Sequence, residues 1–290
     1  MMADDHKRYK RALVGLILAG FALLTLLPFF MTLVMSQKTN GEILNQFWSL
    51  PEQLRPEYYV NAFTFLGVYI GNTVLVGCGT IFGVVFLSSL AGYVFARIDF
   101  AGKKVVFLLI LALMMIPGIL TLIPAFIWYK EFPLVGGNDW LGQGGTGFLN
   151  TRWVLLIPYI ASGQVFGTFL CRSFFESLPE SLFEAARIDG ASEFQLYWRV
   201  ALPLSQPILA TLAILAFVGV YNDYVWPLVT VSSADIQTFS VGITLFAGEG
   251  NLEPGETMAG YVLGSLPLIV VFAFGMKYYV AGLTQGAIKG

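Results

Sequence analysis

The stretch EAARIDGASEFQLYWRVALP occupies residues 184–203 and separates two strongly apolar regions of the chain. It carries five charged side chains, whereas the regions on either side are long enough to cross a membrane. Placing one charged side chain at the centre of a bilayer costs about 2.5–3.5 kcal/mol. The charged stretch therefore lies in water beside a membrane, and the fold depends on how many apolar spans surround it.

The composition of the chain is that of a membrane protein. Of its 290 residues, 57% are hydrophobic and only 12% are charged, too few charges to cover the apolar surface of a soluble domain of this length. The net charge of −2 gives no reason to expect a nucleic-acid partner. One histidine and two cysteines supply no cluster of about four metal ligands, and the spans contain no Ser/His or carboxylate pair. We therefore predict no catalytic residue, no metal site and no cofactor in this chain.

The apolar stretches predict the number of membrane spans. A helix needs about 20 apolar residues to cross the hydrocarbon core, and no stretch shows the alternating pattern of a membrane barrel. We predict an all-α membrane protein, a single domain over residues 1–290 with six transmembrane helices. The spans are expected at about 12–35, 66–95, 104–128, 152–173, 205–229 and 257–280, with a loop at 176–203 between the fourth and the fifth.

The basic residues predict the orientation, because cytoplasmic loops carry an excess of Lys and Arg. With the N-terminus inside, twelve of the sixteen basic residues lie inside, and six spans return the C-terminus to the same side. Both termini and the loop at 176–203 are therefore predicted to be cytoplasmic. The inside set is Lys7, Arg8, Lys10, Arg11, Arg97, Lys103, Lys104, Arg172, Arg187, Arg199, Lys277 and Lys289, and the outside set is Lys38, Arg55, Lys130 and Arg152.

The charged stretch and its lead-in read as two short helices. Ser177 with Glu180 suggests a capping box that begins the first helix, and Gly190 ends it, because glycine accepts the left-handed conformation. Ser192 with Gln195 begins the second helix by the same logic. Two interpretations stay open: a docking element for a partner, or a loop that folds on itself. One face of the first helix is expected to carry Leu178, Leu182, Ala185 and Ala186.

Asp223 is the only acidic residue inside a predicted span, so it must face protein or water. Aromatic rings and hydrogen-bonding side chains suit a sugar, whose C–H face stacks while its hydroxyls seek acceptors. The residues around Asp223 thus predict a substrate route, and a structural hydrogen bond between helices is the other interpretation. The predicted route residues are Tyr221, Asn222, Asp223, Tyr224 and Trp226.

Two further features interrupt the apolar pattern. Pro117 with Gly118 predicts a kink inside the span at 104–128. The glycine-rich stretch at 136–148 lies in an outer loop, and its GQGGTG run lacks the Gly-Lys-Ser/Thr ending of a phosphate-binding loop. The outer loops are either solvated connectors or a docking face for a molecule outside the membrane.

The stretch at 184–203 resembles the EAA loop of ABC importer permeases. The matching residues are Glu184, Ala185, Ala186, Asp189, Gly190, Ala191, Leu202 and Pro203. The stretches AGYVFARIDFAGK, YNDYVWPL, MAGYVLGSLPLIVVF and GLTQGAIKG are similar to the maltose-type branch of carbohydrate permeases. The resemblance covers nearly the whole chain, but the glycine-rich loop at 136–148 matches no pattern of that family.

The resemblance implies a type I ABC importer permease fold in the bacterial inner membrane. It implies a heterodimer with a second homologous permease, two cytoplasmic ATPase subunits that hold the ATP and Mg²⁺, and an extracytoplasmic binding protein that delivers a carbohydrate. It assigns coupling to the ATPase to Glu184, Ala185, Ala186, Asp189, Gly190, Leu202 and Pro203.

Two other functions compete with a sugar importer. An ion-coupled secondary transporter would use Asp223 as a proton or sodium site, and an integral membrane enzyme would need a catalytic constellation. The secondary transporter needs no cytoplasmic docking helix, so the EAA-like stretch favours the importer.

Overall fold

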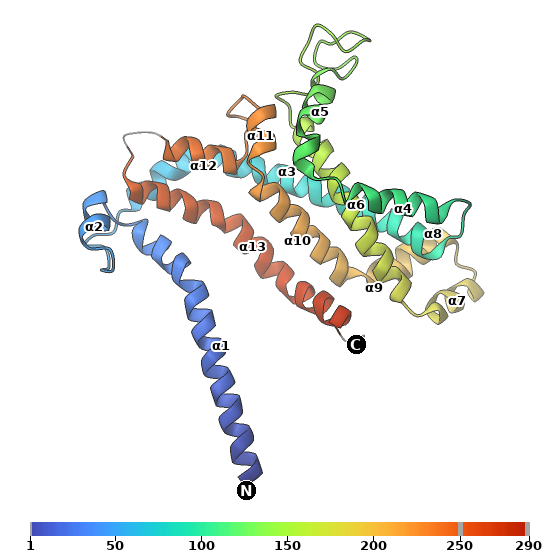
Figure 1. Ribbon diagram of the computed structural model, residues 1–290, viewed down its shortest axis with the longest axis horizontal. Helices are drawn as coiled ribbons and strands as arrows, with labels where there is room; N and C mark the ends of the chain where they lie inside the picture. The colour runs from blue at the N-terminus through green and yellow to red at the C-terminus, as the bar shows by residue number, and fades with distance from the viewer. Residues whose placement is uncertain (1, 249–251, 288–290) are drawn as a thin grey trace. The chain divides into compact units, whose positions relative to one another are not determined.

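The computed structural model describes residues 2–248 and 252–287, and within these ranges every regular element is a helix (Figure 1). This confirms the predicted all-α class. The helices in chain order are α1 Met2–Met35, α2 Asn40–Asn45, α3 Pro56–Arg97, α4 Lys103–Leu113, α5 Gly118–Lys130, α6 Trp153–Ser177, α7 Glu180–Ile188, α8 Glu193–Gln195, the π-helical η1 Leu196–Ala201, α9 Leu202–Leu204, α10 Gln206–Asn222, α11 Val225–Thr230, α12 Phe239–Ala247 and α13 Pro254–Ala287.

Four of the described helices are long and apolar enough to cross a membrane by themselves: α1, α3, α6 and α13. Two bent pairs of helices raise the number of candidate spans to as many as six. In the first pair, α4 and α5 meet at an angle of 97°, and the break contains Pro117, as the sequence predicts. Proline cannot donate an N–H and disfavours a helical residue before it, so α4 cannot run on into α5.

The chain forms two compact units. Unit 1 comprises Met1–Gly67 and Ile243–Leu266, and unit 2 comprises Val68–Gly242 and Pro267–Gly290. All the predicted coupling and route residues fall in unit 2. Buried side chains of unit 2 form two clusters, one at the α7 end of α6 and one at its opposite end. At the α7 end α3 and α6 pack closely at Gly92, where a Cβ would lie 2.5 Å from the Cβ of Cys171.

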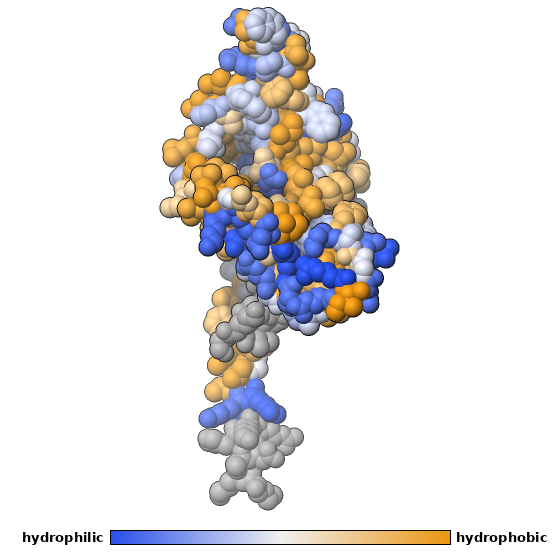
Figure 2. All heavy atoms as spheres, turned by 90° about the vertical axis from the view of Figure 1, so that its right-hand side faces the viewer, coloured by the Kyte–Doolittle hydropathy of each residue, from blue (hydrophilic) through white to orange (hydrophobic). Residues whose placement is uncertain are grey.

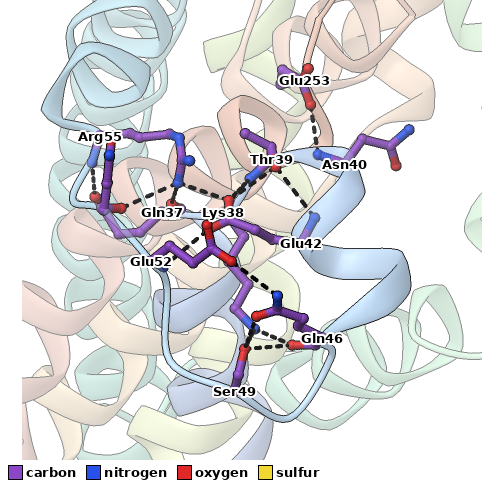
Figure 3. A network of polar contacts seen from close by, with 11 residues as sticks. Gln37, Lys38, Thr39, Asn40, Glu42, Gln46, Ser49, Glu52, Arg55 and Glu253 are labelled. Carbon is purple, nitrogen blue, oxygen red and sulfur yellow. Dashed lines mark hydrogen bonds and ion pairs between the residues drawn. The ribbon is translucent and has the colours of Figure 1, made fainter.

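Unit 1 contains a polar network in the loop between α1 and α3 (Figure 3). Lys38 is fully buried, and its ammonium donates to the carbonyls of Gln46 at 2.7 Å and Phe47 at 3.2 Å. Carbonyl acceptors satisfy this buried cation, since a buried charge needs hydrogen-bonding partners. The ammonium thereby fixes the course of the loop from residue 46 to residue 49.

Glu42 is the second centre of this network. Its carboxylate accepts hydrogen bonds from the backbone N–H groups of Thr39 at 2.7 Å and Glu52 at 3.0 Å, and it pairs with Arg55 at 2.9 Å. The bond from Thr39 comes first among the interactions that lower the pKa of Glu42 to about 2, followed by the bond from Glu52. Hydrogen bonds and an ion pair thus hold the loop to the carboxylate of Glu42, which stays charged over most of the pH range.

Candidate functional site

The charged segment, residues 180–204, folds as two short helical stretches joined by a turn. Gly190 has φ of +82°, its N–H donates to the carbonyl of Arg187, and the N–H of Ala191 donates to that of Ala186. These two bonds form a Schellman cap, which requires the left-handed conformation at Gly190. The predicted stop at Gly190 is confirmed.

One of the two predicted capping boxes is present. Ser192 and Gln195 exchange both bonds of the box at the start of α8, as the sequence predicts. The box predicted at Ser177 and Glu180 is wrong. α6 runs on through Ser177, whose hydroxyl donates back to Phe174, and Pro179 caps α7 without a side-chain bond.

The buried face of α7 differs from the predicted one. Phe183 is fully buried in the cluster at this end of unit 2, and Ala186 packs against that cluster. Leu182 is 44% exposed and Ala185 is also exposed, so the predicted apolar face divides between core and surface. The helix turns Phe183 inward because the largest apolar side chain gains most from leaving water. An exposed strip with small Ala185 remains available to a partner.

Charged side chains brace the segment against the rest of unit 2. Arg97, at the end of α3, pairs with Glu180, and its guanidinium donates to the carbonyls of Phe175 and Leu178, both at 2.7 Å. The guanidinium carbon also lies 4.1 Å from the ring centroid of Phe183. Arg97 therefore joins α3, α6 and α7. This role of Arg97 was not predicted from the sequence, although the residue lies in AGYVFARIDFAGK, one of the stretches that carry the family resemblance.

The brace continues to the second stretch. Arg187 pairs with Glu180 at 3.0 Å and with Glu193 at 3.3 Å, and the hydroxyl of Tyr93 donates to Glu193. The bond to Glu180, and then that to Glu193, raises the pKa of Arg187. Arg97, Glu180, Arg187 and Glu193 thus form one continuous network on unit 2.

The remaining charges of the segment are exposed. In the part of the chain that the structure describes, the side chains of Glu184, Asp189 and Arg199 have neither a hydrogen bond nor an ion pair. Figure 2 shows the hydrophilic side chains gathered at this end of unit 2, below a surface that is mostly hydrophobic. A helix that pairs some of its charges internally and presents others to water is equipped to meet a charged partner.

Leu202 and Pro203 lie just before the bend that joins the segment to α10. The N–H of Leu202 donates to the carbonyl of Tyr197, a π-helical bond, and Pro203 has no N–H to donate. The helical stretch Glu193–Leu204 meets α10 at 76°. A π-helical turn and a bend thus connect the charged segment to α10.

Asp223 lies at a second break, between α10 and α11. Its carboxylate accepts from the hydroxyl of Tyr159 in α6 at 3.0 Å and from the backbone N–H of Trp226 at 3.3 Å, in the first turn of α11. Its backbone carbonyl accepts from the hydroxyl of Ser240 in α12. Asp223 therefore makes structural hydrogen bonds between helices, which is one of the two interpretations of this residue. These bonds connect the break to α6, α11 and α12.

Asp223 also lines a cavity, as the other interpretation requires. The cavity has a volume of about 340 Å³ and lies among α5, α6 and α11, with the hydroxyls of Thr121, Tyr159 and Ser162 in its wall. A second hollow of about 170 Å³ shares Tyr159 and Ser162 with it and reaches Thr80 in α3. The two hollows follow one face of α6.

The other predicted route residues are not gathered around this cavity as a group. Trp226 lines it but is only 8% exposed, and its indole N–H donates to the carbonyl of Val154 at 2.8 Å. Tyr221 is buried against Phe217 and Phe239. The last two predicted residues, Asn222 and Tyr224, are exposed and do not line the cavity.

No group of three His, Cys, Asp or Glu side chains that could hold a metal ion occurs among the described residues. The fold and these sites define a class of protein: an all-helical, multi-pass membrane protein with a charged helical segment outside the spans and a cavity between helices that Asp223 and a few hydroxyl side chains line. The chain belongs to the family of binding-protein-dependent transport system inner membrane components, whose sequence pattern matches residues 84–285. It is therefore a permease of the inner membrane.

Curated relatives of the chain are permeases as well. The chain is 29% identical to the diacetylchitobiose uptake system permease protein NgcG of Streptomyces coelicolor, over 99% of this chain and 91% of the relative. It is 31% identical to the arabinooligosaccharides transport system permease protein AraQ of Halalkalibacterium halodurans, over 94% of each. It is 33% identical to the trehalose/maltose transport system permease protein MalG of Thermococcus litoralis, over 77% of this chain and 75% of the relative.

Solved structures share the fold. A bacterial ABC transporter involved in the import of the acidic polysaccharide alginate contains a chain that matches with a TM-score of 0.76, over 94% of this chain and 97% of that one. The sequence identity is 23%, so the match establishes the fold alone. The predicted type I importer permease fold is consistent with it.

Proposed function

We propose that this permease conducts an oligosaccharide as one half of an ATP-driven importer. A second, homologous permease forms the other half of the route, and an extracytoplasmic binding protein delivers the sugar. Two cytoplasmic ATPase subunits hold ATP and Mg²⁺, so this chain does no covalent chemistry. The observation that carries this proposal is the segment 180–204, which is braced to α3 and α6 and presents unpaired, exposed Glu184 and Asp189.

The geometry supports a mechanism of coupling. The exposed strip of α7 around Ala185 docks on an ATPase subunit, with Glu184 and Asp189 setting its register. Because Arg97 ties α7 to the ends of α3 and α6, a displacement of α7 moves these two spans together. The bend at Leu202–Pro203 passes the same displacement to α10. We propose Glu184, Ala185, Ala186, Asp189, Gly190, Leu202 and Pro203 as the coupling residues.

The cavity supports a carbohydrate as the substrate. Hydroxyls and a carboxylate suit sugar hydroxyls, each of which both donates and accepts hydrogen bonds. Among the described residues that line the two hollows there is no Lys, Arg or His to attract an anion. The names of the curated relatives refer to neutral saccharides, such as arabinooligosaccharides and trehalose or maltose. The route residues Tyr221, Asn222 and Tyr224 then act through the α10–α11 break and not as lining.

The orientation is part of the proposal: both termini and the charged segment lie in the cytoplasm. In a chain without its two native cysteines, a cysteine at exposed Asn45 should react with an impermeant thiol reagent in intact cells. Cysteines at exposed Ala101 and Ser192 should stay protected until the membrane is opened. The reverse pattern would exclude docking of the segment on cytoplasmic subunits.

The decisive measurement is uptake into proteoliposomes that hold the complete importer, with ATP or an imposed proton gradient as the only energy source. We expect uptake with ATP and no response to the gradient. Uptake driven by the gradient without ATP, and abolished in Asp223→Asn, would show an ion-coupled transporter instead. The substrate for this assay is identified by calorimetric titration of the purified binding protein with neutral oligosaccharides and with uronate oligosaccharides as the control.

A further inference from the structure

The loop between α5 and α6, residues 131–150, is the glycine-rich stretch that the family resemblance leaves unexplained. It contains no helix, yet hydrogen bonds within its backbone and from two of its side chains hold it together. The amide of Asn138 donates to the carbonyls of Lys130 and Phe132, and its oxygen accepts from the N–H of Gly145 at 2.8 Å. Asp139 in turn accepts from two N–H groups that follow it. We call this folded loop the knob.

Glycine makes the knob compact. At Gly142, with φ of +81°, a Cβ would lie 2.0 Å from the carbonyl oxygen of Glu131. At Gly147 a Cβ would lie 2.2 Å from the carbonyl oxygen of Tyr129. Side chains are excluded from these close backbone approaches, so the knob has one well-defined shape before any partner arrives.

The tip of the knob presents large apolar side chains. Trp140 is 73% exposed, Leu141 is 58% exposed and Leu134 is 77% exposed. Exposed polar residues, including Asp139 and Gln143, stand beside Trp140 and Leu141 in the sequence. Tryptophan is enriched in protein-binding hot spots, and polar residues border such surfaces. Lipid suits this surface poorly, because hydrocarbon cannot satisfy the exposed backbone groups of the glycines.

The base of the knob is attached to α11, the helix that begins at the Asp223 break. The ring of Tyr129 lies against Phe148 of the knob and against Trp226 of α11, with centroid distances of 6.2 and 5.8 Å. At the other end of α11, the side-chain oxygen of Asn150 accepts from the N–H groups of Ser232 and Ser233. The knob thus holds α11 at both ends, beside the cavity.

We propose that the knob is the docking point on this subunit for the solute-binding protein, and that it transmits docking to the α10–α11 break. The knob precedes α6 and the charged segment follows it, so within unit 2 the two lie at opposite ends of that helix (Figure 1). On the proposed function, on which this inference rests, the charged segment faces the ATPase. The knob then faces the side from which the binding protein arrives.

The first test measures affinity. The complete importer in lipid nanodiscs is titrated with its purified, sugar-loaded binding protein, and ATPase stimulation is followed. Trp140→Ala should raise the half-maximal concentration about tenfold, as expected for a hot-spot side chain. Trp140→Phe should recover most of the affinity. A shift of less than about twofold for Trp140→Ala would overturn the docking proposal.

The second test separates docking from transmission. Asn150→Ala removes the acceptor for Ser232 and Ser233 while leaving the tip intact. We expect the half-maximal concentration of binding protein to stay the same and the maximal stimulation to fall at least twofold. An unchanged maximum would overturn the transmission part.

The third test identifies the occupant. A photo-crosslinking side chain at position 140 should form an adduct with the binding protein and none at position 274, which is 77% exposed on apolar α13. An adduct with lipid or with the second permease at position 140 would refute the proposal. The proposed function and the docking point fail in different ways. If the binding protein does not stimulate the ATPase of the unaltered importer, the proposed function is refuted. If it stimulates the unaltered importer and the Trp140→Ala variant with the same half-maximal concentration, only the docking point is refuted.

Discussion

The two ends of α6 carry protruding segments that are built in opposite ways. The segment after α6, residues 180–204, is helical and is braced by a network of charged side chains that begins at Arg97. The loop before α6, residues 131–150, contains no helix and is braced by backbone hydrogen bonds, by bonds from the side chains of Asn138 and Asp139 to that backbone, and by close glycine contacts. The first segment also has exposed charged side chains without a partner among the described residues, and the second has exposed apolar side chains.

This difference determines how each segment can fail. A structure braced by ion pairs depends on charge and on the direction of a few long side chains, so a single charge change alters it. A structure braced by backbone contacts tolerates surface changes and fails where a Cβ is added. The following predictions test this contrast, beginning with the largest expected effect.

Gly190→Val should abolish coupling, with ATP-driven uptake falling at least tenfold. A β-branched residue at φ of +82° costs about 1–3 kcal/mol, so the turn adopts another conformation and misdirects the exposed strip of α7. Gly102→Val is the matched control, because Gly102 has φ of +81° and equally open surroundings outside the segment. Uptake is measured in proteoliposomes at equal protein content. Equal losses in both variants would assign the effect to general strain.

Glu184→Lys should weaken assembly with the ATPase subunits, and we expect their copurification to fall about threefold to tenfold. Glu184 has no partner among the described residues, so the exchange removes nothing from the fold of this chain. Glu176→Lys is the control: it reverses a charge near the end of α6 whose partner, Arg172, belongs to the same helix. We expect this variant to retain the ATPase subunits. Retention of the ATPase by the first variant and its loss in the second would contradict the proposed docking face.

Gly142→Ala should destabilise the knob far more than Gly137→Ala. Both glycines have positive φ, +81° and +84°, but only at Gly142 does a Cβ meet backbone, at 2.0 Å against 3.8 Å at Gly137. Backbone strain at positive φ therefore affects both variants, whereas steric overlap of the new Cβ with backbone affects only Gly142→Ala. Hydrogen exchange of residues 131–150 in the complete importer measures the difference. Similar protection in both variants would mean that close backbone approach does not stabilise the knob.

Asp223→Asn should lower ATP-driven uptake by only a few-fold. The amide keeps the shape but offers one acceptor oxygen, so it can satisfy either Tyr159 or the N–H of Trp226, not both. Tyr159→Phe is the matched variant, since it removes one bond and keeps the carboxylate. We expect a smaller loss in Tyr159→Phe, measured as uptake rate at equal protein content. Complete loss in Asp223→Asn with ATP present would indicate that the charge itself is required.

The smallest effect is expected in the loop of unit 1, which like the charged segment is braced by charges. The folded-state pKa of Glu42, about 2, lies below the ordinary value of 4.5. Its stabilisation is therefore complete above pH 4.5 and is lost as the pH falls through 2. Hydrogen exchange of residues 36–55 should differ between the wild type and Glu42→Gln at pH 7, and this difference should vanish below pH 2. A difference that persists well below pH 2 would mean that the carboxylate charge does not hold the loop.

Local sequence features predicted much of the charged segment correctly. Gly190 and the Ser192–Gln195 box are confirmed, because capping and left-handed turns depend on residues within about six positions of one another. The predicted box at Ser177 failed because α6 had packing partners that extended it past the expected end. Helix ends are decided by such contacts as much as by capping residues.

The sequence by itself determined that this is an all-helical membrane protein with a charged segment between spans, because hydropathy and helix stops act over neighbouring residues. Only the tertiary structure decided which charged side chains pair with one another within the chain. Arg97 and Glu180 are 83 positions apart, and no pattern along the chain announces their pairing. The same holds for Trp226, which the structure buries against Tyr129 and Val154. Contacts between distant segments depend on how helices pack, and packing is a property of the folded chain.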